Sequence, residues 1–344
     1  MMIKEVLTFK PKEVSKKLLS PLPERARDII KKRYGLDNAE PLTLEAIGKT
    51  YGITRERVRQ IEEFTLNTIR KSDVFKDSQH YLMELKQVME QYGGVVHEEE
   101  FLNHLDGNNL SQNHAHFLLV LGGAFTKLKE DEEFHHRWTI DPELAHRIED
   151  CLRGVCHDLN EDALLPESEM IETVLKKFGV QGRTELDRER AKRWLKISKD
   201  IDMSPVGEWG LSKSPNVRVR GIRDYAFLVL RKHGSPMHFR EVAKAIQTNF
   251  GKKANPATCH NELIKDKRFV LVGRGIYALA EWGYTRGVVR DVIKAILQTE
   301  GPLPEAEVLE KVMKERHVKP NTILVNLKNP KYFKKDKSGK YVAV

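Results

Sequence analysis

We predict a mainly α-helical fold, in which a helix-turn-helix module is followed by four modules of three helices and a small β-hairpin. Two features of the sequence indicate this fold. Residues 42–62 contain two short amphipathic patterns around a glycine, which is typical of two helices joined by a tight turn. Downstream, a small-residue turn, amphipathic helices and a closing basic or aromatic hairpin recur about every 70 residues, as in a chain built from repeated modules.

The helix-turn-helix module is predicted from capping residues and apolar spacing. The Thr43 hydroxyl can cap the free N–H groups of a first helix, in which Ile47 and Tyr51 are apolar at helical spacing. Gly52 supplies the turn, and Thr54 caps the second helix.

The second helix has a polar, arginine-rich side that is predicted to contact DNA bases. Val58, Ile61 and Thr65 point inward, which leaves four side chains on the other side, here called the recognition face: Arg55, Glu56, Arg59 and Gln60. Arg can bind two acceptors of one guanine, Glu can accept from cytosine, and Gln can pair with adenine. Phosphate contacts are predicted for Thr43, Lys49, Thr54 and Arg57. The alternative is an ordinary solvated helix face with i, i+4 charge pairs.

The same stretch resembles region 4 of the bacterial primary sigma factors. The resemblance runs from P-L-P-E-R-A-R-D-I-I-K-K-R-Y-G-L at 21–36 through T-L-E-A-I-G at 43–48 to I-T-R-E-R-V-R-Q-I-E at 53–62. It implies that the recognition face contacts the minus-35 element of promoter DNA, and that the module docks on the flap of the RNA polymerase β subunit. Nothing ahead of or behind this stretch resembles the helix that opens the minus-10 element, so the resemblance does not imply a complete sigma factor that melts promoters.

The rest of the chain carries a weak internal repeat that predicts four winged-helix modules. The copies open 70, 71 and 67 residues apart, at Gly93, Ala163, Gly234 and Gly301. Each copy closes with two predicted strands and a turn, over 125–138, 194–211, 268–279 and 332–344. Three helices and a closing hairpin make a winged helix. The predicted modules are therefore 1–73 for the helix-turn-helix, followed by 74–140, 141–215, 216–285 and 286–344.

The module at 216–285 shows the repeat most clearly. It contains R-D-Y-A-F-L-V-L-R-K-H-G-S-P-M-H-F-R-E-V-A-K-A-I at 223–246 and G-R-G-I-Y-A-L-A-E-W-G at 273–283. Over residues 221–284 it resembles the winged-helix family called HARE-HTH, which also occurs in the delta subunit of some bacterial RNA polymerases. The last module is similar in outline only, and the first two diverge further.

The winged-helix modules differ in whether they suit DNA. The two C-terminal modules have polar and basic side chains on the third helix and the wing. These side chains are secondary DNA-binding candidates, and the alternative is ordinary solvated faces. The candidates are Thr258, His260, Asn261, Lys265 and Arg274 in the first of these modules, and Lys319, Asn321, Thr322 and Lys328 in the second. The last wing adds Lys334, Lys335, Lys337 and Lys340. The first winged-helix module has an apolar third helix and an acidic wing, K-E-D-E-E-F. It is expected to contact protein, either another module of this chain or RNA polymerase.

The charge distribution agrees with a modular nucleic-acid-binding protein. The 344-residue chain has 32% charged residues and a formal charge of +9. Residues 1–72 have 16 Lys and Arg against 10 Asp and Glu (+6), residues 73–165 have 7 against 19 (−12), and residues 166–344 have 36 against 21 (+15). Basic ends can bind DNA phosphates. An acidic middle suits protein contact or masking of a basic neighbour, and the alternative is solubility alone.

The sequence also argues against membrane and redox proteins. No apolar run approaches the roughly 18 residues of a membrane span, and M-M-I-K-E-V-L at the N-terminus lacks an apolar signal core. We expect no membrane partner and a cytoplasmic, nucleoid-associated bacterial protein. Cys151, Cys156 and Cys259 are too few and too irregular for a disulfide framework, so we expect reduced thiols.

No constellation for metal binding or catalysis is evident. Six histidines lie between His97 and His136, but no Cys or acidic residue accompanies them at zinc-like spacing. Gly273 and Gly275 are predicted to form a wing turn, because no phosphate-binding lysine follows them. We find no nucleophile with a base and no cofactor motif. We therefore expect no enzyme, no metal, no cofactor and no small-molecule substrate.

These observations predict a sequence-specific transcription factor that binds minus-35-like promoter DNA and the RNA polymerase flap. The C-terminal winged helices would add further contacts to DNA or polymerase. Two alternatives stay open. The protein could be an adaptor that only docks on polymerase and sequesters the flap from sigma factors, without base recognition. It could also be the DNA-recognition part of a defence or modification system.

Overall fold

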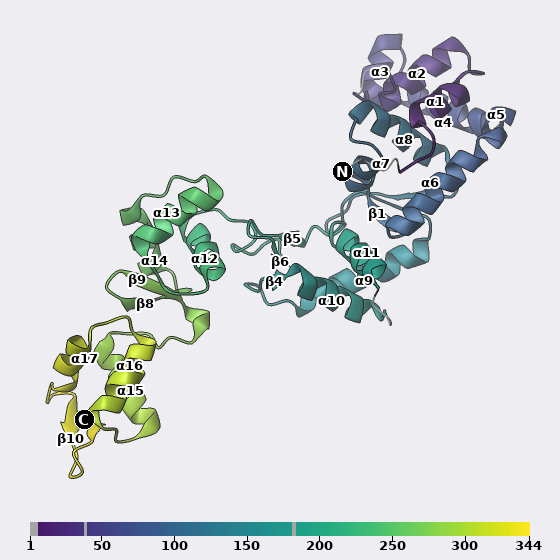
Figure 1. Cartoon of the computed structure of the whole chain (residues 1–344). Helices are drawn as coiled ribbons and strands as arrows, with labels where there is room; N and C mark the ends of the chain where they lie inside the picture. Colours follow the sequence, from purple (N-terminus) through teal and green to yellow (C-terminus); the bar gives the residue numbers. More distant parts are fainter. Residues whose placement is uncertain (1–5, 38–39, 181–183) are drawn as a thin grey trace. The chain divides into compact units, whose positions relative to one another are not determined.

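The computed structural model describes residues 6–37, 40–180 and 184–344, and it is mainly α-helical with small β-sheets, as predicted (Figure 1). The chain divides into two compact units, Met1–Asp202 (unit 1) and Met203–Val344 (unit 2). Within the described ranges no helix is long and apolar enough to cross a bilayer. The segment predicted to lack a signal core includes residues 1–5, which lie outside the described residues.

Unit 1 begins with the helix-turn-helix module, which consists of α1 (Pro11–Leu19), α2 (Glu24–Tyr34), α3 (Leu44–Tyr51) and α4 (Arg55–Lys71). The predicted caps are confirmed. The Thr43 hydroxyl accepts from the Ala46 N–H, and the Thr54 hydroxyl accepts from the Arg57 N–H. Gly52 ends α3 with a φ of +64°, which glycine adopts without strain.

The next part of unit 1 has the helix and strand order of a winged helix. It comprises α5 (Asp73–Asp77), α6 (Gln79–Tyr92), β1 (Val95–His97), α7 (Glu98–Leu105), α8 (Asn109–Leu121), β2 (Thr126–Leu128) and β3 (Arg137–Thr139). The strands form an antiparallel sheet in the order β1-β3-β2, in which Val96 and Lys127 both lie opposite Trp138. The sequence predicted the β2–β3 hairpin but not the short β1 strand.

The following elements are α9 (Pro142–Asp158), β4 (Leu165–Pro166), α10 (Glu167–Phe178), α11 (Glu185–Leu195), β5 (Ile201–Met203) and β6 (Glu208–Leu211). The strand predicted to start at Trp194 is wrong, because Trp194 and Leu195 form the last turn of α11. Thr184 and Asp187 cap this helix reciprocally, and Ala191, Trp194 and Leu195 are buried. Capping and burial at helical spacing extend the helix to Leu195.

Unit 2 repeats the winged-helix order twice. The first copy is α12 (Ile222–His233), β7 (Met237–His238), α13 (Phe239–Phe250), α14 (Pro256–Lys265), β8 (Phe269–Gly273), β9 (Ile276–Leu279) and a short 3₁₀ turn, η1 (Ala280–Trp282). Its sheet has the order β7-β9-β8. The second copy is α15 (Val289–Glu300), α16 (Glu305–Glu315), α17 (Pro320–Leu327), β10 (Phe333–Lys335) and β11 (Tyr341–Ala343). The five module boundaries proposed from the sequence stay a prediction.

The helix-turn-helix module and the first winged helix share one hydrophobic core. Phe117 and Leu118 of α8 are fully buried in the same cluster as Leu18 of α1 and Ile30 of α2. The Asn113 side chain donates to a carbonyl just past the end of α2, and the Arg70 guanidinium of α4 donates to two carbonyls at the end of α8. The apolar third helix, expected to contact protein, therefore packs against an earlier module of its own chain (Figure 1).

Candidate nucleic-acid interface

The recognition face lies on the first half of α4 and points away from the module. Arg55, Glu56, Arg59 and Gln60 are all exposed. On the opposite side of α4, Val58 packs with Ile47 and Ile29 in a small separate core. The orientation predicted from helical periodicity is therefore present in the structure.

A glycine that the sequence analysis did not single out fixes the approach of α3 to α4. The Ile53 N–H donates to the Gly48 carbonyl over 3.0 Å. A Cβ atom at Gly48 would lie 2.6 Å from the Ile53 carbonyl oxygen, which is closer than carbon and oxygen atoms can pack. Gly48 therefore lets the turn lie directly against α3. A glycine inside an otherwise amphipathic helix is the signal that could have identified it.

Helix α2 contacts the recognition helix through a partly buried acid. The Glu62 carboxylate of α4 accepts from the Tyr34 hydroxyl over 2.8 Å and from Arg33 Nε over 3.3 Å. Burial and the neighbouring Glu62 raise the pKa of Tyr34 well above its usual value, so this phenol stays protonated and can donate. The contact holds α4 in a defined orientation relative to α2.

Side chains of the recognition face pair with one another along the helix. Arg59 donates to both carboxylate oxygens of Glu56, with Nε–Oε2 and Nη2–Oε1 distances of 3.0 and 2.8 Å, and also to Glu63 over 3.1 Å. This pairing with Arg59 lowers the pKa of Glu56, which therefore stays ionised. Gln60 accepts from Arg57 over 3.1 Å. Exposed pairs of this kind contribute little to stability, so they can exchange for DNA contacts.

The predicted phosphate-binding residues lie on α3, on α4 and at the N-caps of these two helices. The Thr43 and Thr54 hydroxyls serve as acceptors in their caps, so their hydrogens can still be donated to a phosphate. Lys49 is exposed and pairs with Glu45 over 3.1 Å. Arg57 is exposed one residue before the buried Val58. Whether these residues touch DNA stays a prediction.

The secondary candidates lie on α14, α17 and their wings. Thr258, Asn261, Lys265 and Arg274 are exposed, and so are Lys319, Asn321, Thr322 and Lys328. His260 differs, because it is half-buried. Its ring stacks on Phe239 with a centroid distance of 4.4 Å and meets Tyr277 edge-on at 5.8 Å.

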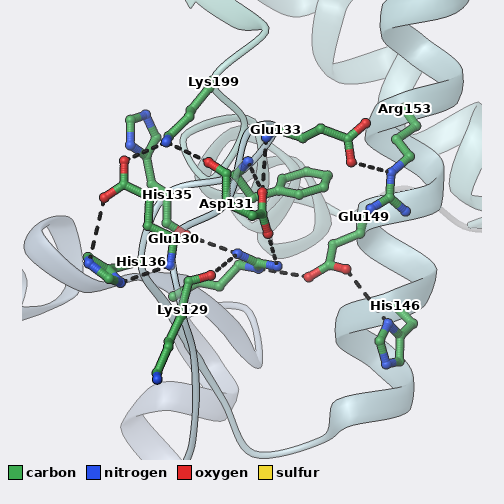
Figure 2. Close-up of polar contacts among 12 residues, drawn as sticks. Lys129, Glu130, Asp131, Glu133, His135, His136, His146, Glu149, Arg153 and Lys199 are labelled. Carbon is green, nitrogen blue, oxygen red and sulfur yellow. Dashed lines mark hydrogen bonds and ion pairs between the residues drawn. The ribbon is translucent and has the colours of Figure 1, made fainter.

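Three carboxylates of the acidic wing of unit 1 form ion pairs with basic residues around them (Figure 2). Asp131 pairs with Arg137 of β3 over 3.1 Å, and Arg137 is also bonded to Glu149 of α9 over 2.7 Å. Further ion pairs join Glu130 to Lys199 over 2.5 Å and Glu133 to Arg153 over 2.8 Å. The wing thus contacts the following elements of its own unit, which is one of the alternatives that its charge left open.

The histidines and cysteines do not form an evident reactive site. In the part of the chain that the structure describes, no three His, Cys, Asp or Glu side chains are grouped as metal ligands. Burial raises the pKa of each cysteine thiol, Cys151, Cys156 and Cys259, to about 11. These thiols are therefore protonated at neutral pH and are poor nucleophiles.

Two parts of the chain match known families. Residues 18–71 match sigma-70 region 4, and residues 222–282 match HARE-HTH, the helix-turn-helix domain described from ASXL proteins and restriction endonucleases. Both resemblances found in the sequence are thereby confirmed. The two matches support a DNA-binding, transcription-related role.

Similar proteins include two sigma factors. The chain is 44% identical over 66 residues to the RNA polymerase principal sigma factor HrdD of Streptomyces viridifaciens, and 44% identical over 59 residues to the RNA polymerase sigma factor SigA of a Bacillus species. These stretches cover 19% and 17% of this chain, and 20% and 16% of the two relatives. The likeness is therefore confined to one module.

Proposed function

We propose that this protein binds promoter DNA at a minus-35-like element and acts as an accessory factor or regulator of transcription initiation. The observation that carries this proposal is the exposed recognition face of α4, which lies inside the stretch that matches sigma-70 region 4. Its role is binding alone, without catalysis.

In the proposed complex, α4 enters the major groove with its N-terminal half. Arg55 makes no hydrogen bond or ion pair among the described residues, so it can bind a guanine edge directly. Gln60 can exchange its contact with Arg57 for an adenine. Thr54, which caps α4, and Lys49 on α3 contact phosphates.

The proposal includes contact with RNA polymerase, by way of the β flap. One apolar side of the helix-turn-helix module, which includes Leu18 and Ile30, is covered by α8. Polymerase must therefore displace α8 or use exposed apolar side chains, of which Phe64 on α4 is 75% exposed. A pull-down of core polymerase by wild type and by Phe64→Ala separates these two modes, because only the second depends on Phe64.

A binding selection from random duplex DNA tests the promoter proposal. Wild type is compared with Arg55→Ala/Gln60→Ala at near-physiological salt, because low salt lets basic residues bind any sequence. Asn67→Ala/Lys71→Ala is the matched control, since it removes one amide and one positive charge from the end of α4. We expect a minus-35-like motif from wild type and the control only. Absence of any motif from wild type contradicts the proposal.

The second candidate is a polymerase-binding adaptor without base recognition. It is favoured by the pairing of Arg59 with Glu56 and Glu63, which satisfies these side chains without DNA. In that case Arg55→Ala/Arg59→Ala leaves DNA affinity unchanged and polymerase still binds. Loss of sequence-selective DNA binding in this variant eliminates the adaptor.

A further inference from the structure

Within unit 2, the wing of the first winged helix is joined to the loop between α16 and α17. Gly273, at the end of β8, forms a parallel β-bridge with His317. The His317 N–H donates to the Val272 carbonyl over 2.7 Å. A Cβ at Gly273 would lie 2.7 Å from the His317 carbonyl oxygen, so the approach requires glycine. The α16–α17 loop thereby pairs with the free edge of the β7-β9-β8 sheet.

A buried arginine makes a second connection at the same place. Arg316 is 3% exposed, and its guanidinium donates to the carbonyls of Thr285 and, over 3.1 Å, Gly287. These two carbonyls belong to the linker between η1 and α15. These hydrogen bonds restrict the movement of the linker relative to Arg316. The junction of Gly273, Arg316 and His317 therefore holds the two winged helices in one arrangement.

This junction brings two sets of predicted DNA contacts together. Because the bridge is parallel, the chain leaves Gly273 and His317 in the same direction, toward Arg274 and toward Lys319, and both are exposed. With about 5 Å between paired strands and about 3.5 Å per extended residue, their Cα atoms lie within roughly 15 Å of each other. That distance corresponds to about four base pairs of one duplex.

We infer that the two C-terminal winged helices form one composite surface for the backbone of a single DNA duplex. In it, wing residue Arg274 of one module and Lys319 at the start of α17 contact phosphates within about four base pairs of each other. Residues 203–344 have 27 Lys and Arg against 13 Asp and Glu, a formal charge of +14, which suits a polyanion. The inference rests on the proposed DNA-binding role, but it concerns unit 2 and not the recognition face.

The first experiment measures the salt dependence of binding to a duplex that lacks any minus-35-like sequence. The full chain carries Arg55→Ala/Gln60→Ala throughout, so that base recognition by α4 does not contribute. We expect Arg274→Ala and Lys319→Ala each to reduce the slope of log affinity against log salt by about 1, and the double variant to reduce it by about 2. Lys294→Ala, an exposed lysine on α15, is the charge-matched control and should retain the slope. An unchanged slope for either Arg274→Ala or Lys319→Ala overturns the inference.

The second experiment breaks the junction and retains the phosphate contacts. Gly273→Val places side-chain atoms against the His317 carbonyl, and Arg316→Ala removes the linker contacts. Uncoupling two binding modules lowers the effective concentration of the second, so both variants should bind the same duplex about 3- to 10-fold more weakly. Circular dichroism checks that the helices of each variant persist. If Arg316→Ala unfolds, Arg316→Lys is measured in its place. Unchanged affinity in folded variants means that the modules bind independently, which overturns the composite surface without affecting the promoter proposal.

Discussion

Arg59 and Glu56 form a two-point ion pair on the exposed side of α4, with nitrogen–oxygen distances of 2.8 and 3.0 Å. The ion pair orients both side chains, because it fixes the plane of the Arg59 guanidinium along the helix. A base that binds one of them must share or break the pair. We therefore expect positions 56 and 59 to act as one unit in the proposed base recognition.

The first prediction concerns this coupling. Glu56→Ala and Arg59→Ala should each weaken binding to the selected DNA about 5- to 100-fold, the range of a lost base contact. The double variant should lose less than the product of the two effects, because the pair is already absent in each single variant. Affinity measurements on all four proteins test this. Independent, multiplicative losses contradict a shared role.

The second prediction concerns the α3–α4 turn. Helix propensity favours Gly48→Ala by about 0.5–1 kcal/mol, but the added Cβ meets the Ile53 carbonyl oxygen at 2.6 Å. We expect the clash to dominate, with a net loss of about 1–2 kcal/mol in the free energy of unfolding. Urea denaturation measures this. Gly123→Ala is the control, because no atom lies within 4 Å of its Cβ position. Equal or increased stability of Gly48→Ala is the contradicting result.

The third prediction concerns the shared core of unit 1. Phe117 of α8 is fully buried and packs on Tyr34 of α2 with a ring-centroid distance of 5.2 Å. Phe117→Ala should cost about 3–4 kcal/mol and should accelerate amide hydrogen exchange in α2 as much as in α8. Leu263→Ala in α14 removes a comparable buried side chain and should leave α2 protected. Unchanged protection of α2 in Phe117→Ala means that the two modules unfold separately.

The fourth prediction concerns pH. Burial lowers the pKa of His116 to about 4, and Lys127 and Arg33 act in the same direction against the opposing charge of Glu98. Between pH 7 and pH 5 the unfolded chain gains a proton on this group and the folded chain does not. The free energy of unfolding therefore falls by about 2 kcal/mol over this range.

Chemical denaturation at pH 7 and pH 5 measures how the free energy of unfolding depends on pH. His116→Gln should reduce the difference between the two values. Some dependence remains, because burial also lowers the pKa of three other histidines, His97, His104 and His114. His157→Gln changes an exposed histidine and should behave as wild type. Identical pH dependence in His116→Gln and wild type contradicts the assignment.

Local signals in the sequence determined the helix-turn-helix module and the existence of its recognition face. The Thr43 and Thr54 caps, the Gly52 turn and the inward Val58 lie where the sequence predicted them. These signals act over three or four residues, because a cap or a turn involves only neighbouring backbone groups. The same is true of the β8–β9 hairpin, which a glycine-containing turn and flanking apolar residues specify.

Only the tertiary structure decided how the modules meet. Trp194 continues a helix and not a strand, because its buried face follows the helical period of α11. Tertiary packing places α8 against α1 and α2, and it pairs Gly273 with His317, residues that are 44 positions apart. Apolar surface and charge are visible in a sequence, but their partners depend on contacts between distant segments. The sequence therefore determined which residues face outward, and long-range packing determined which of them lie together.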